Sequence, residues 1–388
     1  MTVALHHVFD SPVDKIIFDV SHQTYIHKML TGRQKAFIDP KHYDDVSGYT
    51  NPKESEHDLF TIGHTSTSLS LASGILHARD LKNEKSNVVA IIGDGALSGG
   101  MAYEGLNTIA TLGTNAIIII NDNDQSIAKN PKGGIYTALE SLRETKGQAT
   151  NNIFKALGYD YHYLEDGNNL EELISLFKEV KDIDHPVVLH IYTEKGKGFE
   201  PAERNHEKFH AGGPFSLETG EYIKKGAVTS TYNGITSEYL TKKLKEDPLA
   251  VVINAGTPGI VFNRKLREQL GSQFVDVGIA EEQAVTMTTG LAKNGAKPVW
   301  AVLSTFLQRT YDQLSHDMAL NNQAGVVLVY SASINSMNDE SHLGFFDIPF
   351  ISHIPNFVYL APISKEEHLA MLEWAINQNA HPVAIRVP

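Results

Sequence analysis

The sequence predicts an α/β fold made of two doubly wound, mostly parallel sheets. Short, nearly continuous apolar runs recur along the chain, and stretches with a helical pattern lie between them. Such runs are typical of strands buried on both faces, and helices between them indicate the crossovers that parallel strands need. A chain of 388 residues can bury more than one core, so we expect two domains.

The strand-like runs form two series. In the first series they lie at 15–20, 88–93, 116–122 and 186–193, with helical patterns at 68–81 and 169–182. In the second series they lie at 250–256, 274–278, 297–304, 325–332, 357–362 and 382–387, with helical patterns at 281–295 and 365–378. The polar, glycine-bearing stretch at 209–226 predicts a domain over 1–212, a linker over 213–232 and a domain over 233–388.

Charge and composition narrow the class of protein. The net charge of −13 argues against non-specific nucleic-acid binding, since nothing would offset the phosphate repulsion. The chain has no cysteine, which excludes disulfides and thiolate chemistry and fits a cytoplasmic protein. No apolar stretch approaches the length of a membrane span, and residues 1–10 lack the pattern of a signal peptide. We therefore expect small-molecule ligands, with neither nucleic acid nor a membrane among the partners.

An acidic residue follows the second predicted strand. Asp94 lies in a Gly-Asp-Gly sequence, and Asn123 follows the next strand in the motif NDND. Open parallel sheets bind ligands beyond the carboxyl ends of their strands, so both side chains should project at one edge. Their oxygens suit Mg²⁺ or Ca²⁺, and Gly99 and Gly100 allow a diphosphate to approach the start of the next helix. The alternative is a simple turn at Asp94 and a solvated strand end at Asn123.

The combination of Gly-Asp-Gly, a strand and Asn123 resembles the motif of thiamine-diphosphate enzymes. Such an enzyme needs a second element, a carboxylic acid that hydrogen bonds to a ring nitrogen of the coenzyme's aminopyrimidine in a dry pocket. Glu281 follows the strand at 274–278 and begins a helix, so it can supply that acid. The alternative is an acidic residue favoured there by the helix dipole alone.

Longer stretches resemble the transketolase group and, within it, the 1-deoxy-D-xylulose-5-phosphate synthase family. The stretches that carry this resemblance are 18–33, 63–74, 93–107, 121–127, 194–203, 209–213 and 304–317. They extend over nearly the whole chain and are together far more specific than any one motif. The resemblance implies a first domain that binds diphosphate and metal, and a second domain that binds the pyrimidine.

The resemblance also implies the residues that hold thiamine diphosphate and Mg²⁺. The implied metal ligands are Asp94, Asn123 and the backbone carbonyl of Gln125. Contacts to the coenzyme are implied for His22, Gly63, His64, Thr65, Gly95, Ala96, Asn123, Phe199, Glu281 and Phe306. Phe199 takes a position where the family usually has tyrosine, so stacking is kept and a hydroxyl is lost.

Catalytic roles are implied for three residues, Glu281, His22 and His342. Glu281 matches the activator of the aminopyrimidine, and Phe306 matches the ring that stacks on it. The residues implied to contact substrate are Arg309, His342 and His210. The alternative for His22 is a hydrogen-bonded histidine at a helix start. The alternative for Arg309, His342 and His210 is a surface or core role.

The family reaction joins pyruvate to glyceraldehyde 3-phosphate with loss of CO₂. The resemblance therefore implies a homodimeric transferase of isoprenoid-precursor and thiamine biosynthesis. Compared with the family, we expect the chain to be shortened at both ends, without an upstream active-site histidine and without the third, C-terminal domain.

Two further departures concern the acceptor substrate. The segment 329–347 has no arginine where the family usually holds one for the acceptor's phosphate, and Leu303 replaces a tyrosine. Three alternatives stay open: ketol transfer as in transketolase, another acceptor aldehyde, or a catalytically impaired coenzyme-binding core.

Overall fold

The computed structural model describes residues 1–223, 231–334 and 340–388. The chain divides into two compact units, Met1–Tyr222 and Ile223–Pro388, and each is described by itself. Part of the predicted linker (224–230) and part of the arginine-free segment (335–339) lie outside the described residues. In the described ranges, no helix has both the length and the apolar character needed to cross a membrane.

The first unit contains a five-stranded sheet with the order β1-β2-β3-β5-β4, in which neighbouring strands pair in parallel. The strands are β1 (Lys15–Phe18), β2 (Val88–Gly93), β3 (Ala116–Asp122), β4 (Asp160–Leu164) and β5 (Pro186–Tyr192). Four of these strands were predicted from their apolar runs, and β2 and β3 have the predicted bounds. The parallel α/β class is confirmed for this unit.

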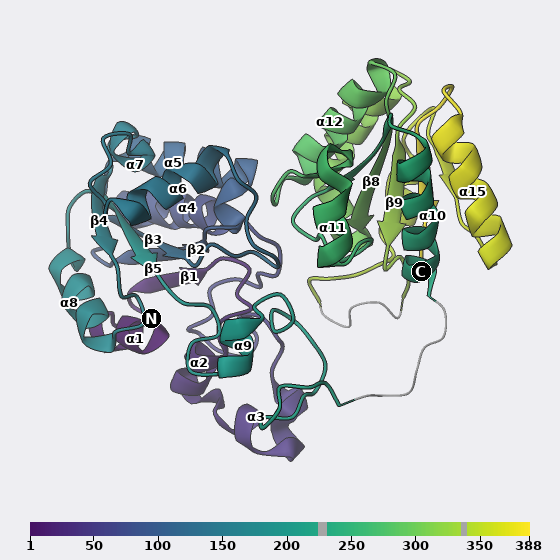
Figure 1. Cartoon of the computed structure of the whole chain (residues 1–388). Coiled ribbons are helices and arrows are strands. Elements are labelled where there is room, and N and C mark those ends of the chain that lie inside the picture. Colours follow the sequence, from purple (N-terminus) through teal and green to yellow (C-terminus); the bar gives the residue numbers. More distant parts are fainter. Residues whose placement is uncertain (224–230, 335–339) are drawn as a thin grey trace. The chain divides into compact units, whose positions relative to one another are not determined.

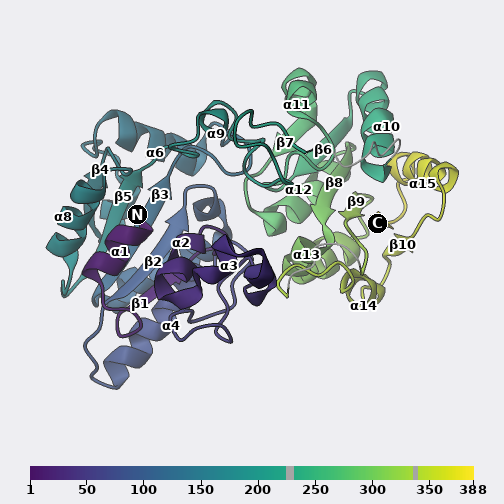
Figure 2. The ribbon, with the colours of Figure 1, turned by 90° about the horizontal axis from the view of Figure 1, so that it is seen from below.

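Helices cover both faces of the first sheet, because its central strands β2, β3 and β5 are buried along nearly their whole length (Figure 1). Alternate residues of β2 enter two cores: Ala90 packs with α4 (Ser68–Leu81) and α5 (Gly100–Leu112), whereas Ile91 packs with α1 (Thr2–Val8) and α8 (Leu170–Val180). Figure 2 is a view from below and has α1 and α8 on the near side of this sheet. The unit is therefore doubly wound, as the sequence predicts.

The second unit contains a six-stranded parallel sheet with the order β10-β11-β9-β8-β6-β7. The strands are β6 (Ala250–Asn254), β7 (Phe274–Asp276), β8 (Lys297–Leu303), β9 (Val326–Tyr330), β10 (Val358–Leu360) and β11 (Val383–Arg386). One core holds Leu328 with residues of α10 (Tyr232–Glu246) and α15 (Lys365–Asn377). The other holds Val327 with residues of α12 (Glu281–Lys293). This sheet is thus also buried on both faces (Figure 1).

Shorter helices lie in the connections. In the first unit they are α2 (Tyr25–Lys28), η1 (Met29–Arg33), α3 (Lys35–Ile38), η2 (Pro40–Asp45), η3 (Ala96–Ser98), α6 (Gly134–Glu144), α7 (Ile153–Ala156) and α9 (Glu200–Arg204). In the second unit they are α11 (Arg264–Leu270), η4 (Gly271–Gln273), α13 (Ser304–Leu307), η5 (Gln308–Thr310), η6 (Gln313–Ala319) and α14 (Asp347–Ser352). Strand β4 was not predicted, because this edge strand alternates polar and aromatic residues instead of forming an apolar run.

Candidate active site

Asp94 and Asn123 lie together at the carboxyl ends of β2 and β3. Gly93 pairs with Asn121 in the sheet, and the Asp94 N–H donates to the Asn121 carbonyl at 3.3 Å. The backbone N–H of Asn123 in turn hydrogen bonds to the Asp94 carboxylate, which is 1% exposed. The structure therefore brings Asn123 next to the Asp94 carboxylate, at the sheet edge where the sequence placed both residues.

The environment of Asp94 favours a bound cation. Burial raises the pKa of Asp94, and the negative charge of Asp122 raises it further. Asn130 Nδ2 donates to Asp94 Oδ2 at 2.5 Å, a contact that the sequence did not predict. A divalent ion beside Asp94 would offset both the lost hydration and the repulsion from Asp122.

The candidate metal site is composed of unlike oxygen donors. No group of three or more His, Asp or Glu side chains suited to a metal ion occurs among the described residues. Asp94 would supply a carboxylate, Asn123 an amide oxygen and Gln125 a backbone carbonyl. Asn123 Oδ1 accepts the Gln125 N–H at 3.1 Å, so these two residues form one tight turn. Such a donor set fits Mg²⁺, which takes few protein ligands and completes its shell with water and phosphate oxygens.

The predicted diphosphate segments, 63–65 and 95–96, are brought together by Asp19 and Ser66. Asp19 follows β1 and is buried, and its carboxylate accepts the N–H groups of Ser66 at 2.7 Å and Ser68 at 3.0 Å. Ser66 Oγ donates to the Ala96 carbonyl at 2.6 Å. These bonds fix the segment that leads into α4 against the turn after Asp94. Sequence reasoning missed both residues, since nothing in their local pattern marks a contact so distant along the chain.

The backbone around this segment is strained at three positions. Val20, Ser21 and Ser66 have φ values of 58°, 68° and 70°, which are uncommon for residues other than glycine. Ser21 is held by its own Oγ, which donates to the Ile62 carbonyl at 2.8 Å and accepts the Thr50 N–H at 2.9 Å. Strain of this kind persists only where the surroundings over-determine it and often marks a functional site.

Lys195, His210 and His22 form a cluster of basic groups in the first unit. Lys195 Nζ lies 3.0 Å from His210 Nδ1 and donates to the Ser126 carbonyl at 2.5 Å, and the rings of His210 and His22 are 5.9 Å apart. Burial lowers the pKa of Lys195 to about 8. Burial and the charge of Lys195 lower the pKa of each histidine to about 4. The cluster suits an anionic ligand; the sequence predicted both histidines but not Lys195.

Phe199 packs within its own segment. Its ring contacts those of Phe209 and Phe215 at centroid distances of 5.5 and 5.6 Å. Stacking of Phe199 on a coenzyme therefore stays a prediction.

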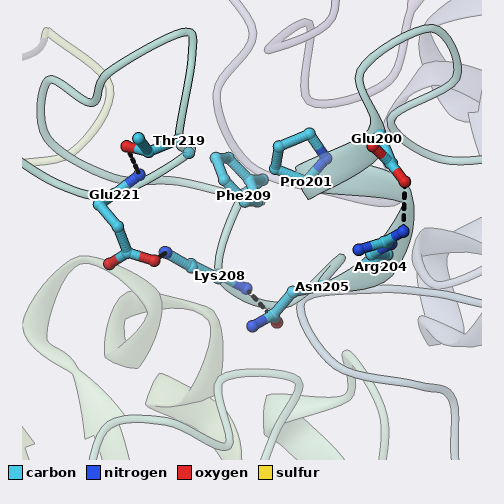
Figure 3. Close-up of a pocket in the computed structure, with 9 residues that line it drawn as sticks. Glu200, Pro201, Arg204, Asn205, Lys208, Phe209, Thr219 and Glu221 are labelled. Atoms are coloured by element: carbon cyan, nitrogen blue, oxygen red, sulfur yellow. Dashed lines mark hydrogen bonds and ion pairs between the residues drawn. The ribbon is translucent and has the colours of Figure 1, made fainter.

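A shallow hollow of about 270 Å³ lies between α9 and the segment that follows it (Figure 3). Its lining mixes both charges, as Figure 3 shows: Glu200 pairs with Arg204, and Lys208 with Glu221. None of the predicted site residues lines it. We therefore do not take this hollow as the active site.

Glu281 begins α12 in the second unit and is 2% exposed. Burial raises its pKa to about 7, against the opposing charge of Arg309. Arg309 Nη1 lies 3.6 Å from Oε2, close enough for charge attraction but too far for a hydrogen bond. Among the described residues, Glu281 Oε2 is buried and has no hydrogen-bond partner. A buried carboxyl with an unsatisfied oxygen fits a partner such as a ring nitrogen, which the coenzyme's aminopyrimidine would provide.

Phe306 and His342 lie together in the second unit. Their rings meet edge to face at 5.5 Å, and His342 Nδ1 is 2.8 Å from Ser341 Oγ. The Thr305 hydroxyl donates to the Ser341 carbonyl at 3.4 Å, which joins α13 to the segment carrying His342. The predicted residues of this unit thus form two pairs, Glu281 with Arg309 and Phe306 with His342.

Comparison with known proteins places this geometry in a family. Residues 1–151 and 142–193 match the family model described as 1-deoxy-D-xylulose-5-phosphate synthase, and residues 229–388 match that of the transketolase pyrimidine binding domain. A transketolase from Campylobacter jejuni has a TM-score of 0.40 at 15% identity, covering 100% of this chain and 72% of that chain. That structural likeness is too low to carry an argument.

Curated relatives are much more similar. The chain is 41% identical to a 1-deoxy-D-xylulose-5-phosphate synthase of Listeria monocytogenes, with 100% of this chain and 65% of that protein covered. It is 42% identical to the synthase of Clostridium acetobutylicum, with 100% and 68% covered. The chain thus spans about two thirds of the length of these relatives. By these matches along its whole length, the chain belongs to the 1-deoxy-D-xylulose-5-phosphate synthase family.

Proposed function

We propose that this chain carries out the thiamine-diphosphate- and Mg²⁺-dependent condensation of pyruvate with glyceraldehyde 3-phosphate, releasing CO₂ and giving 1-deoxy-D-xylulose 5-phosphate. Enzymes of this family and of the transketolase family use thiamine diphosphate and a divalent metal such as Mg²⁺. The observation that carries the proposal is the buried carboxylate of Asp94 beside Asn123, in a chain of this family. The product would enter isoprenoid-precursor synthesis; nothing in the comparisons supports a role in thiamine biosynthesis, and none is proposed.

The first unit would hold the charged end of the coenzyme. Asp94, Asn123 and the Gln125 carbonyl would bind Mg²⁺, which also binds the diphosphate. Backbone groups of 63–65 and 95–96 would contact the diphosphate, and Lys195 would add positive charge. When bound, thiamine diphosphate supplies the nucleophilic carbon and the electron sink for decarboxylation.

The second unit would act on the other end of the coenzyme. With its pKa raised to about 7, Glu281 can hold a proton near neutral pH and share it with a ring nitrogen. The Arg309 guanidinium beside it limits how far that pKa rises. Phe306 would stack on the pyrimidine. His342 and Arg309 would contact substrate, as would His22 and His210 of the first unit.

The deciding experiment measures CO₂ release from pyruvate, with and without glyceraldehyde 3-phosphate. The proposal expects release that needs thiamine diphosphate and Mg²⁺ and that the aldehyde accelerates. Release that ignores the aldehyde would count against the synthase reaction. No release under either condition would indicate a coenzyme-binding core without this activity.

A different acceptor is the second candidate, because the segment 329–347 contains no arginine to bind an acceptor phosphate. The same assay distinguishes it when unphosphorylated aldehydes replace glyceraldehyde 3-phosphate. Stronger acceleration by an unphosphorylated aldehyde would favour the second candidate. Ketol transfer from a ketose phosphate without CO₂ release would instead favour a transketolase-like reaction.

A homodimer is part of the same proposal. Large apolar side chains of the segment from α2 to η2 are 44–67% exposed: Tyr25, Ile26, Leu30, Ile38 and Tyr43. Exposed apolar side chains that gather on one short segment suit contact with a second copy of the chain. Light scattering should give twice the 42.7 kDa of one chain, and Leu30→Lys should lower that mass while Val13→Lys, at another exposed site, should not. The cytoplasmic location expected from the sequence stays a prediction.

A further inference from the structure

Asp122 lies inside the candidate metal loop, yet its side chain turns into the protein. It is fully buried, and its Oδ2 accepts hydrogen bonds from His190 Nε2 at 2.7 Å and from Arg143 Nη1 at 2.6 Å. Its Oδ1 accepts the backbone N–H of Asp124 at 3.1 Å. Arg143 and His190 both lie within ion-pair distance of this carboxylate, at 2.6 and 2.7 Å, so its buried Oδ2 is satisfied by two donors.

The bonds to Asp122 continue across the sheet. His190 lies on β5, next to β3, and its Nδ1 is 2.8 Å from the hydroxyl of Tyr161 on β4. Because a carboxylate only accepts, His190 Nε2 must carry a proton, and the tautomer with Nδ1 unprotonated accepts the Tyr161 O–H there. The chain of donors therefore runs from Tyr161 through His190 to Asp122 over three neighbouring strands. The Tyr163 ring meets His190 edge-on at 5.3 Å and helps to hold it.

The same contacts fix the loop that carries the candidate metal ligands. The Asp122 carboxylate closes a turn onto Asp124, whose φ of +56° is held by that bond. Thr193 secures the preceding residues, because its N–H donates to the Asp122 carbonyl at 2.8 Å and its hydroxyl to Asn121 Oδ1 at 2.7 Å. Asn123 and Gln125 alternate with these anchored positions. The positions of their oxygens therefore depend on the hydrogen bonds that His190 and Arg143 donate to Asp122.

We propose that Tyr161, His190 and Arg143 are positioning residues that act through Asp122 to hold Asn123 and Gln125 in the geometry a divalent cation requires. The inference rests on the proposed function, since it takes the loop to be the Mg²⁺ site of a thiamine-diphosphate enzyme. Removing a residue that orients a metal ligand without touching the ion typically lowers metal affinity about 10- to 100-fold. None of these three side chains would touch the ion itself.

The chain offers a matched pair of variants, Tyr161→Phe and Tyr159→Phe. Both tyrosines are buried, at 8% and 4% exposure, and both hydroxyls are hydrogen bonded. Tyr159 donates to the Leu106 carbonyl at 2.6 Å, away from the metal loop. Each change thus removes one buried hydroxyl with similar loss of stability, but only Tyr161→Phe breaks the chain of donors to Asp122.

Two measurements on the full chain test the inference. The first is the Mg²⁺ concentration for half-maximal thiamine diphosphate binding, obtained by calorimetry. We expect Tyr161→Phe to raise it about threefold or more and His190→Phe about tenfold or more, while Tyr159→Phe stays within about twofold of the wild type. His190→Gln keeps an N–H donor and should recover part of the loss. Equal effects of the two tyrosine variants, or no effect of either, would overturn the inference.

The second measurement uses neither metal nor coenzyme. Hydrogen exchange of the peptide that spans 121–126 should be faster in Tyr161→Phe than in the wild type, and unchanged in Tyr159→Phe. Unchanged exchange in Tyr161→Phe contradicts the inference, whatever the chain binds. A different outcome is also possible: exchange changes as expected, but the wild type binds the coenzyme without a divalent ion. In that case the metal site of the proposed function is wrong. The three residues would then hold the loop, but not for a metal ion.

Discussion

Glu281 and Asp94 are both buried carboxylates whose pKa is raised mainly by loss of water. Their neighbours differ, and so do the partners they would accept. Asp94 is flanked by Asn130 and the negative Asp122, which makes a cation its natural partner. Glu281 faces the positive Arg309 and keeps an oxygen without a hydrogen bond, which suits a neutral ring nitrogen. The two carboxylates thus serve opposite ends of one coenzyme in the proposed function.

The raised pKa of Glu281 predicts how stability depends on pH. Its pKa is about 7 in the folded chain against an ordinary value of 4.5 for glutamate, so between these two values the folded state holds a proton that the unfolded state has lost. Stability from this group therefore falls as pH rises from about 4.5 to 7 and is level above. Glu281→Gln should be more stable than wild type at pH 8, by at most about 3 kcal/mol, and the gain should shrink towards pH 5.

Urea unfolding at pH 5 and pH 8 checks this prediction. Glu282→Gln is the matched control, because it neutralises the next residue of the same helix, which is only partly buried. Its stability relative to wild type should change little between the two pH values. A gain for Glu281→Gln that is the same at both would show that Glu281 is not the titrating group.

At the residue scale, the sequence motifs predicted the candidate site residues but not the residues that hydrogen bond to them. Asp94, Asn123 and Glu281 could be predicted because each follows an apolar strand at a recognisable spacing. The contacts that Asn130 and Asp19 make, and the other contacts described above, could not be predicted. The hydrogen bond of Asn130 to Asp94 joins positions far apart in the chain. The sequence around one of these residues does not predict contact with the other.

The strands were the most predictable elements. Most positions of a strand buried on both faces are apolar, and the runs at 88–93 and 116–122 therefore predict the bounds of β2 and β3, although β3 ends in Asn121 and the buried Asp122. Strand β4 is half-exposed at the sheet edge, so its residues, Asp160–Leu164, carry no such signal. Helix α6 was missed because the glycine-bearing stretch before it gave no clear start.

The contact between α4 and α5 supports one prediction for a pair of elements. A Cβ added at Gly105 of α5 would lie 2.6 Å from Leu69 Cβ and 2.9 Å from Ser70 N of α4, so the two helices can approach this closely only with glycine there. Gly105→Ala should force them apart and destabilise the chain by about 1–3 kcal/mol. Because α4 and α5 flank the predicted diphosphate segments, coenzyme binding should weaken too.

Gly74→Ala is the matched control. It changes an exposed glycine within α4, where an added Cβ meets nothing within 4 Å. Alanine favours a helix over glycine, so this variant should gain about 0.5–1 kcal/mol. Thermal unfolding should therefore move in opposite directions for the two variants. A Gly105→Ala chain as stable as wild type would mean that the helices can separate without cost.

The whole molecule combines a net charge of −13 with a proposed ligand that is itself an anion. Long-range attraction therefore does not explain binding, and local positive groups must do so. In the proposed function, a divalent ion at Asp94 would supply this positive charge together with Lys195 and the helix starts. The effect of the ligand on the stability of the chain should therefore depend on the metal.

Thiamine diphosphate with Mg²⁺ should raise the melting temperature of the chain, and chelation should remove the effect. At a ligand concentration of about 100 times Kd the folded state gains about 2.7 kcal/mol. For a unit of the size of Met1–Tyr222 this corresponds to roughly 5–10 °C, measured by calorimetry. Asp94→Asn should lose the shift, whereas Glu140→Gln, which removes a charge from an exposed position of α6, should keep it. A shift that survives chelation, or that Asp94→Asn retains, would mean that the diphosphate is held without the metal.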